Sequence, residues 1–357
     1  MATADGRAAG DASNERAKAR SFHHSEFSVE RIAAARAERG LSVSVCLPAR
    51  ECAATVGRIV AALQPLREAG AIDQLLVVDA ASADGTADLA ERAGADVRQE
   101  AELMPEHGPV LGKGDAMWRA LGALRGELVC FLDADSERFS AHFATGLLGP
   151  LLCEPDVSFV KAFYRRPLAS PARLDAAASD AAVALGAPAA ALAGALLSGD
   201  GTEGGGRVNH LTARPALALL YPQLAQIRQP LAGEVAARRE LLERLPFATG
   251  YGVEIAMLID AWRTVGIDAL AQVDLDEHYN QHKPLAELAP MALTVLATIA
   301  RRVEREGRLT PSSGGARLGD DEPGRAGSQR DARPAAVDPI AANAPLERPP
   351  IASLASR

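Results

Sequence analysis

Three short and almost entirely apolar runs, each accompanied by a stretch with helical periodicity, constrain the fold of this chain more than any other feature. The runs are VSVCLPA (43–49), QLLVVDAAS (74–82) and ELVCFLDAD (127–135). A strand that is apolar on both faces is typical of a parallel sheet covered by helices on both sides. The sequence therefore predicts an α/β fold with a doubly wound, mostly parallel sheet.

Capping residues and apolar spacing predict the helices that join these runs. The first helix, residues 28–40, has a capping Ser28 and a closing Gly40. Four more helices are predicted over 54–70, 85–94, 114–124 and 290–303. The alternation of helices with apolar runs places helices on both faces of the sheet.

Composition argues against several classes of partner. The 357 residues carry a formal net charge of -8, which gives no reason to expect binding to nucleic acid or to an anionic membrane surface. No run of roughly 18 apolar residues occurs, so no membrane span is predicted. The four cysteines lack C-x-x-C spacing and are interpreted as reduced thiols. We therefore expect a cytoplasmic protein that binds neither nucleic acid nor membranes.

Polar residues follow each of the three apolar runs. In open α/β sheets ligands bind beyond the carboxyl ends of the strands, so these residues should converge on one crevice. The third run ends in Asp133 and Asp135, and carboxylate oxygens at this spacing suit Mg²⁺ or Mn²⁺ bridging a diphosphate. The alternative is a turn of solvated carboxylates or a helix cap.

A GKG motif at 112–114 precedes the predicted helix 114–124. Glycines allow the backbone to approach a ligand, and a lysine near the positive end of a helix can pair with phosphate. The motif lacks the spacer and the Ser/Thr of a Walker loop. Lys113 is thus a candidate phosphate ligand, and the alternative is an exposed loop lysine.

The order of these motifs resembles a known family. VSVCLPARE, LLVVDAASADGTADLA, GKGDAMWRAL and FLDAD are similar to the successive blocks of GT-A glycosyltransferases. Later blocks at 205–222, 229–261 and 272–293 resemble glycosyltransferase family 81, the glucosyl-3-phosphoglycerate synthases. The resemblance covers roughly residues 25–303. It implies retaining, metal-dependent transfer of glucose from a nucleotide-diphosphate-glucose, foremost UDP-glucose, to 3-phosphoglycerate, with Mg²⁺ or Mn²⁺ as cofactor.

The resemblance also divides the chain. It implies a nucleotide-sugar-binding region of GT-A fold over 25–165 and an acceptor-binding, mainly helical region over 205–303. The Ala/Gly-rich stretch 166–204 between them is interpreted as an insertion. The ends, 1–24 and 304–357, are polar or rich in Pro, Gly and charge, which predicts disorder. Because the family tends to form dimers, a homodimer is also expected.

Individual roles follow from the same resemblance. The implied catalytic residues are Asp135 at the metal, Arg207 at the acceptor phosphate and Glu254, whose alternative is a structural acid in a first helical turn. The same two alternatives apply to Glu234. Donor-binding residues are implied at Pro48, Ala49, Arg50, Glu51, Cys52, Ala80, Asp84, Lys113, Asp133 and Ala134. Acceptor-binding residues are implied at Arg207, Val208, Asn209, Asn280 and His282, and metal ligands at Asp135, His278 and His282.

Departures from the family pattern affect the donor base and the metal. Cys52 stands where the family has an acidic residue that helps to hold uracil, and Ala80 stands where it has serine, so the donor base stays open. The family's H-x-N motif appears as Asn280-Gln281-His282, apparently exchanged. His278 is then an alternative metal ligand.

Three alternative functions stay open. The same fold could transfer another sugar, such as mannose from GDP-mannose to form mannosyl-3-phosphoglycerate. A nucleotidylyltransferase would share metal-binding aspartates but requires a glycine-rich loop after the first strand, which PARECAAT does not supply. A nucleotide-sugar-binding protein without turnover is the non-enzymatic alternative. For the transferase, no carboxylate can be assigned as a covalent nucleophile, which favours front-face attack with a diphosphate oxygen taking the acceptor's proton.

Overall fold

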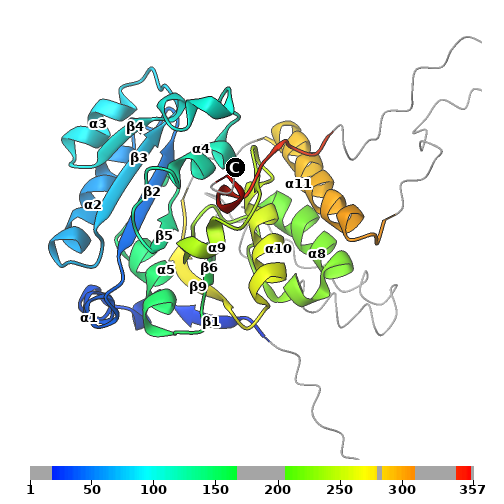
Figure 1. Ribbon diagram of the computed structural model, residues 1–357, viewed down its shortest axis with the longest axis horizontal. Helices are drawn as coiled ribbons and strands as arrows, with labels where there is room; N and C mark the ends of the chain where they lie inside the picture. Colours follow the sequence, from blue (N-terminus) through cyan, green and yellow to red (C-terminus); the bar gives the residue numbers. More distant parts are fainter. Residues whose placement is uncertain (1–17, 167–205, 280–283, 310–342, 355–357) are drawn as a thin grey trace, which may run out of the picture.

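The computed structural model describes residues 18–166, 206–279, 284–309 and 343–354 (Figure 1). Its centre is an eight-stranded sheet in the order β1-β9-β6-β7-β5-β2-β3-β4. Strand β7 runs antiparallel to β5 and β6, and the other neighbouring pairs are parallel. The strands are β1 (Arg20–His23), β2 (Val43–Ala49), β3 (Gln74–Asp79), β4 (Asp96–Gln99), β5 (Leu128–Phe131), β6 (Phe159–Arg165), β7 (Val235–Arg238) and β9 (Leu270–Glu277). The predicted doubly wound, mostly parallel α/β fold is confirmed.

The three apolar runs form β2, β3 and β5 at adjacent places in the sheet. Successive side chains point to opposite faces and enter two separate cores, with Val45 and Leu47 of β2 in one core and Cys46 in the other. Cys46 and Cys130 are buried free thiols, as the sequence predicts. Both faces of the central strands are covered, which accounts for their almost entirely apolar sequence.

Helices cover both faces of the sheet. One core takes apolar residues from α1 (Val29–Arg39), α2 (Val56–Glu68), α3 (Thr86–Arg92) and α5 (His142–Cys153). The other core takes them from α4 (Lys113–Ala120), α8 (Arg214–Leu220), α9 (Arg239–Leu242), α10 (Val253–Val265) and α11 (Leu285–Arg305). At the N-terminus of α1 the Ser28 hydroxyl accepts a hydrogen bond from the Arg31 amide, and Gly40 adopts φ +63° at the other end.

Both chain ends contain ordered strands where the sequence predicts disorder. Strand β1 lies inside the segment 1–24 and pairs with β9 at the edge of the main sheet. In the predicted tail 304–357, β10 (Glu347–Arg348) pairs antiparallel with β8 (Phe247–Ala248). The disorder prediction is wrong for these parts, because the backbone of each short strand forms hydrogen bonds with a strand distant in sequence. Residues 1–17, 310–342 and 355–357 of the two predicted ends lie outside the described residues, as does the insertion apart from Arg166.

The C-terminal region contributes strands as well as helices. Strands β7 and β9 lie within the main sheet, and α10 and α11 pack on one of its faces. Helix α11 buries Val295, Ile299 and Val303 within the subunit, and the predicted homodimer stays a prediction. Among the described residues, no helix is both long enough and apolar enough to span a membrane.

Candidate active site

The carboxyl ends of β2, β3 and β5 meet at one edge of the sheet. Strand β2 lies between the other two and is parallel to both. The Ala80 amide after β3 donates to the Ala49 carbonyl at the end of β2, at 2.9 Å. The Thr55 hydroxyl donates to the Ala134 carbonyl in the turn after β5, at 2.6 Å. These two hydrogen bonds therefore hold the three predicted donor-binding loops together.

Lys113 lies between two carboxylates at this edge. Its Nζ is 2.6 Å from Oδ1 of Asp133 and 2.9 Å from Oε1 of Glu254, which belongs to the first turn of α10. Burial favours the neutral amine, but the two carboxylates outweigh burial and hold the pKa of Lys113 well above its usual value. The half-buried lysine therefore stays protonated and joins segments 20 and 141 residues away along the sequence.

Glycines permit the close packing around this lysine. Gly112 adopts φ +91°, and a Cβ on Gly114 would overlap the Ala248 carbonyl of β8. A Cβ on Gly233, in the PLAGE block, would overlap the Asp133 carboxylate. These glycines let β8 and the segment before β7 approach Lys113 and Asp133.

Asp135 lies beside a buried network that includes His278. Its side chain is open to solvent, but nearby protein displaces part of the surrounding water, and this effect, followed by the charge of Asp133, raises the pKa of Asp135. The next residue, Ser136, has its Oγ 2.9 Å from Nε2 of His278. The same Nε2 is 3.1 Å from Oε1 of Glu234. The loops after β5 and β9 thus meet beside Asp135.

Glu234 is held as an anion by its neighbours. Burial would raise its pKa, but His278 and the hydrogen bond from the Tyr164 hydroxyl, at 2.8 Å, hold the pKa well below the usual value. Tyr164 also stacks on His278, with ring centroids 4.6 Å apart. Glu234 is therefore a buried partner of these two rings, and it precedes strand β7 rather than a helix.

A divalent metal fits the residues around Asp135. The Asp135 carboxylate is open, and Nδ1 of the adjacent buried His278 has no hydrogen-bond partner. Carboxylate oxygens suit Mg²⁺ and Mn²⁺, and neutral imidazole is a common metal ligand. Asn280 and His282, the other candidates from this segment, lie outside the described residues. His278-Tyr279-Asn280 itself has the H-x-N order, a signal that the sequence interpretation did not use.

The loop after β2 is braced by the loop after β3. The Asp84 carboxylate accepts hydrogen bonds from the amides of Ala53 and Thr86, at 2.9 and 3.0 Å. The Glu51 amide donates to the Ser82 hydroxyl at 2.8 Å. The carboxylate oxygens of Asp84, which the sequence predicts to bind the donor, therefore accept hydrogen bonds within these loops. Arg50 is exposed at the sheet edge.

Cys52 stands where the resemblance implies an acidic residue, and its surroundings keep its side chain uncharged. Its amide donates to the Thr86 hydroxyl at 2.8 Å, and its thiol lies 3.2 Å from the Arg50 carbonyl. Burial raises the pKa of Cys52 to about 11, so the thiol stays neutral at physiological pH. Cys52 can therefore offer a base only a weak, uncharged partner.

The predicted acceptor-binding residues Arg207 and Val208 lead into the π-helical turn Asn209–Ala213. The buried Asn209 donates to the Arg228 carbonyl at 3.2 Å, and its Oδ1 has no hydrogen-bond partner. The Arg228 guanidinium lies over the Phe163 ring, 4.5 Å from its centroid. The sequence interpretation missed Arg228, whose only signal was its place in the chain before the PLAGE block.

Arg166 is a further cation that the sequence interpretation missed. Its guanidinium donates to the Tyr164 hydroxyl at 2.9 Å and lies 5.1 Å from the Tyr164 ring centroid. Tyr164 in turn donates to Glu234, so Arg166 connects with the network that contains His278. The FYRRPL stretch carried the signal, because two adjacent arginines stand at the end of a buried strand.

Within the described ranges a single group of three possible metal ligands lies close together: His23, His24 and Asp276, whose ligand atoms lie within 4.8 Å of one another. Nε2 of His24 is 2.7 Å and Nε2 of His23 is 3.2 Å from the Asp276 carboxylate. The Ser25 amide donates to Nδ1 of His23, which places the proton of a neutral ring on Nε2, toward Asp276. We interpret this group as hydrogen-bonded pairs that attach β1 to β9.

The sequence of this chain is similar to those of several known proteins. The family model described as glycosyl transferase family 2 matches residues 44–164. The glucosyl-3-phosphoglycerate synthase of Mycolicibacterium paratuberculosis is 42% identical over 283 residues, covering 79% of this chain and 78% of that protein. The synthase of the same name from Petrotoga mobilis is 35% identical over 293 residues, covering 81% and 82%.

Solved structures extend the likeness to three dimensions. Mannosyl-3-phosphoglycerate synthase from Rubrobacter xylanophilus has a TM-score of 0.70 and 45% identity, covering 82% of this chain and 83% of that one. Glucosyl-3-phosphoglycerate synthase from Mycobacterium tuberculosis, in complex with Mn²⁺, UDP-glucose and phosphoglyceric acid, has a TM-score of 0.68 and 34% identity, covering 94% and 99%. This chain is an enzyme that belongs to the glucosyl-3-phosphoglycerate synthase family of glycosyltransferases.

Proposed function

We propose that this enzyme transfers glucose from UDP-glucose to 3-phosphoglycerate with retention of configuration, giving glucosyl-3-phosphoglycerate. The observation that carries the proposal is the protonated Lys113, held between Asp133 and Glu254 at the sheet edge next to Asp135. A fixed cation at the carboxyl ends of parallel strands is suited to a diphosphate. A synthase of the family is known in complex with UDP-glucose and phosphoglyceric acid, which supports this pair of substrates.

The donor would lie across the ends of β2, β3 and β5. The loops that contain Arg50 and Asp133 would bind the nucleotide, and Lys113 would pair with the diphosphate. Asp135 and His278 would hold Mg²⁺ or Mn²⁺, the ions present in complexes of related synthases. When bound, the ion supplies positive charge that stabilises the departing diphosphate.

The acceptor would bind on the side of Arg207 and Asn209. A guanidinium can bind the phosphate of 3-phosphoglycerate through two hydrogen bonds, and the free Oδ1 of Asn209 can accept one from a donor group. Holding the acceptor there would orient its hydroxyl for attack on the anomeric carbon.

Retention is proposed to occur by front-face attack. Asp133 and Glu254 are paired with Lys113, and Glu234 is held by Tyr164 and His278. None of these three carboxylates is free to form a covalent bond to the sugar. A diphosphate oxygen of the donor would then accept the proton of the attacking hydroxyl.

A mannosyltransferase reaction is the second candidate. It is favoured by the 45% identity to the Rubrobacter mannosyl-3-phosphoglycerate synthase and by Cys52, which removes an acidic group from the base site. The two candidates differ in the donor and share the acceptor.

The test is a donor panel. The full-length enzyme is incubated with Mg²⁺ or Mn²⁺, 3-phosphoglycerate and each of UDP-glucose, GDP-glucose, ADP-glucose and GDP-mannose, and free nucleoside diphosphate is measured. We expect the highest kcat/KM with UDP-glucose and an α-linked product by NMR. A preference for GDP-mannose would favour the second candidate, and nucleotide binding without turnover would indicate the non-enzymatic alternative.

Asp135→Ala tests the metal role. We expect loss of turnover, because the open carboxylate is the acidic ligand proposed for the ion, with an unchanged melting temperature in the absence of metal. The matched control is Glu137→Ala, an exposed acid two residues away. Unchanged turnover in Asp135→Ala would remove the assigned role.

A further inference from the structure

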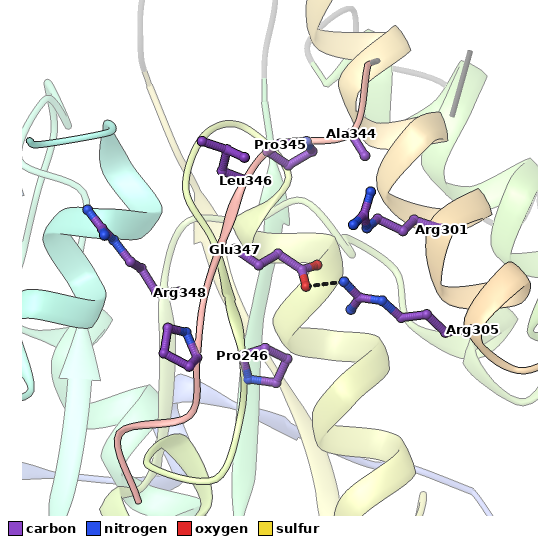
Figure 2. A pocket seen from close by; sticks show the side chains of 9 residues that line it. Pro246, Arg301, Arg305, Ala344, Pro345, Leu346, Glu347 and Arg348 are labelled. Atoms are coloured by element: carbon purple, nitrogen blue, oxygen red, sulfur yellow. Dashed lines mark hydrogen bonds and ion pairs between the residues drawn. The ribbon is translucent and has the colours of Figure 1, made fainter. Parts of the chain in front are cut away.

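The C-terminal residues 343–354, hereafter the C-terminal strap, cross the molecule between α4 and α11 (Figure 1). Two neighbouring side chains of the strap extend in different directions, Glu347 toward α11 and Arg348 toward α4 (Figure 2). We propose that the strap is part of the donor site and that Arg348 is a positioning residue for Lys113. This inference rests on the donor-binding role proposed for Lys113.

Arg348 holds the loop that precedes Lys113. Its guanidinium is 2.6 Å from Oδ1 and 3.0 Å from Oδ2 of Asp115, which lies two residues after Lys113. It also donates to the carbonyls of His107 and Pro109, at 2.6 and 2.9 Å. One side chain from the end of the chain thus binds both sides of the segment that carries Lys113.

Asp115 connects Arg348 with a second arginine. The Asp115 side chain is fully buried and accepts a hydrogen bond from Nε of Arg119 at 3.0 Å. Arg119 also donates to the carbonyls of Leu103, Met104, Gly108 and Pro109. Burial would raise the pKa of Asp115, but Arg348 and Arg119 outweigh burial and lower the pKa. Asp115 is therefore ionised, and the two arginines together fix the backbone over 103–109.

The strap also supports the glycine that follows Lys113. The Leu346 carbonyl accepts hydrogen bonds from the amide and hydroxyl of Thr249, at 2.9 and 3.0 Å. The Thr249 carbonyl accepts in turn from the Gly114 amide at 3.1 Å. Because Gly114 packs directly on β8, a shift of the strap would move β8 and the backbone next to Lys113.

Glu347 connects the strap to the helix that carries the other partner of Lys113. Its carboxylate is 3.2 Å from Arg302 and 2.6 Å from Arg305 of α11. Arg302 also binds Asp260 of α10 through Nε, at 3.0 and 3.1 Å. Glu254 belongs to the first turn of that same α10. The strap is therefore fastened both to the loop of Lys113 and, through Arg302, to the helix of Glu254.

The consequence for binding follows from the geometry. Without Arg348, the loop 103–112 loses two donors to its carbonyls and Asp115 keeps only one of its two arginines. Lys113 then samples a wider range of positions, and a cation that must move into place binds a diphosphate less well than one already held there. The acceptor does not contact this loop in the proposed arrangement, so its binding should change little.

The experiment compares Arg348→Ala, Arg348→Lys and the control Arg301→Ala in the full-length chain. Arg348 and Arg301, which belongs to α11, both line a cavity of about 400 Å³ (Figure 2). We expect Arg348→Ala to raise the KM for the donor by roughly 10- to 100-fold while the KM for 3-phosphoglycerate stays within about twofold. Arg348→Lys keeps a positive charge next to Asp115 but loses the guanidinium that donates to both carboxylate oxygens, so its effect should be intermediate. Arg301→Ala should match the wild type.

A double-mutant cycle with Lys113→Ala separates positioning from a general loss of structure. If Arg348 acts through Lys113, Arg348→Ala should weaken donor binding little further in a chain that already lacks Lys113. Additive effects, or an unchanged donor KM in both Arg348 variants, would overturn the proposal. If Arg348→Ala does not fold, the cycle is run with Arg348→Lys.

A binding measurement keeps this test independent of the proposed reaction. The affinities of UDP and GDP are measured by calorimetry for the wild type and both Arg348 variants, together with hydrogen exchange of the amides of Leu111 and Gly114. Weaker nucleotide binding with faster amide exchange in the Arg348 variants supports the positioning role of the strap, even if no sugar is transferred. Unchanged nucleotide affinity and unchanged amide exchange contradict the positioning role of the strap, whatever the donor proves to be.

Discussion

The two terminal strands are attached to the molecule by different means. Strand β1 extends the edge of the main sheet, and its His23 and the following His24 contact Asp276, whose side chain is 51% exposed. Strand β10 pairs with only two residues of β8, but its Arg348 contacts Asp115, whose side chain is 0% exposed. Exposed ion pairs contribute little to stability, whereas a buried charge depends strongly on its partners. The shorter strand therefore has the stronger side-chain attachment.

The largest difference between the two attachments should come from removing the buried charge. Asp115→Asn is expected to lower the free energy of unfolding by about 3–5 kcal/mol, because Arg119 and Arg348 lose the anion that they share. Urea unfolding followed by circular dichroism measures the change. A loss below about 1 kcal/mol, the usual range of exposed pairs, would remove the contrast between the two strands.

Glu100, near Asp115, makes the stability of the region around this buried ion pair sensitive to rising pH. Burial, followed by the charge of Asp115, raises the pKa of Glu100 to about 7 from 4.5, and its Oε1 has no hydrogen-bond partner. The unfolded chain ionises Glu100 near pH 4.5, but the folded protein resists ionisation until about pH 7. The stability associated with the protonated carboxyl is therefore full below pH 4.5 and is lost as the pH rises to 7.

Glu100→Gln should remove this loss. At pH 8 the variant is expected to be more stable than the wild type by at most about 3 kcal/mol, with little difference at pH 4. Unfolding free energies at pH 4, 6 and 8 measure the effect. A stability difference that does not change with pH would contradict the raised pKa.

Gly114→Ala tests the contact between β8 and the Lys113 loop. The added methyl group would overlap the Ala248 carbonyl, so β8 must shift, and we expect a loss of about 1–3 kcal/mol together with weaker nucleotide binding. Gly250→Ala is the matched control, because a Cβ there has no neighbour within 4 Å. Equal effects of the two substitutions would show that the contact with β8 is not the cause.

The smallest effect is expected at β1. The hydrogen bond from His24, followed by that from His23, lowers the pKa of Asp276, so the stability it contributes is present above the ordinary carboxyl pKa and is lost as the pH falls through the lower folded value. Asp276→Asn, which suits the φ of +64° at this position, should cost less than about 1 kcal/mol at pH 7. A larger loss of unfolding free energy, measured by thermal unfolding, would show that the side-chain attachment of β1 is as strong as that of β10.

The sequence predicted the centre of the fold well because the signal there is local. The run 43–49 coincides with β2, and the capping residues Ser28 and Gly40 bound α1 as expected. Strands β1 and β10 were missed since four and two residues carry no pattern of their own. Their ordering depends on partners that lie more than 90 residues away along the chain.

The candidate site shows the same limit. Lys113, Asp133 and Asp135 could be named from the sequence because each follows or precedes an element that the sequence itself predicts. The network of Tyr164, Glu234 and His278 brings together three strand ends, and Arg348 is 233 residues from Asp115. No local pattern signals such contacts, because they exist only after the sheet has assembled.

Arg348 comes after every strand of the main sheet in the sequence, and this order has a consequence for biosynthesis. A ribosome has already made every strand of the main sheet long before it reaches the codon for this arginine. A product that terminates early, or that a protease trims after residue 342, would contain every strand of the main sheet but would bind its nucleotide less tightly. Translation past Arg348 would then be needed for substrate capture even though every strand of the main sheet has already been made.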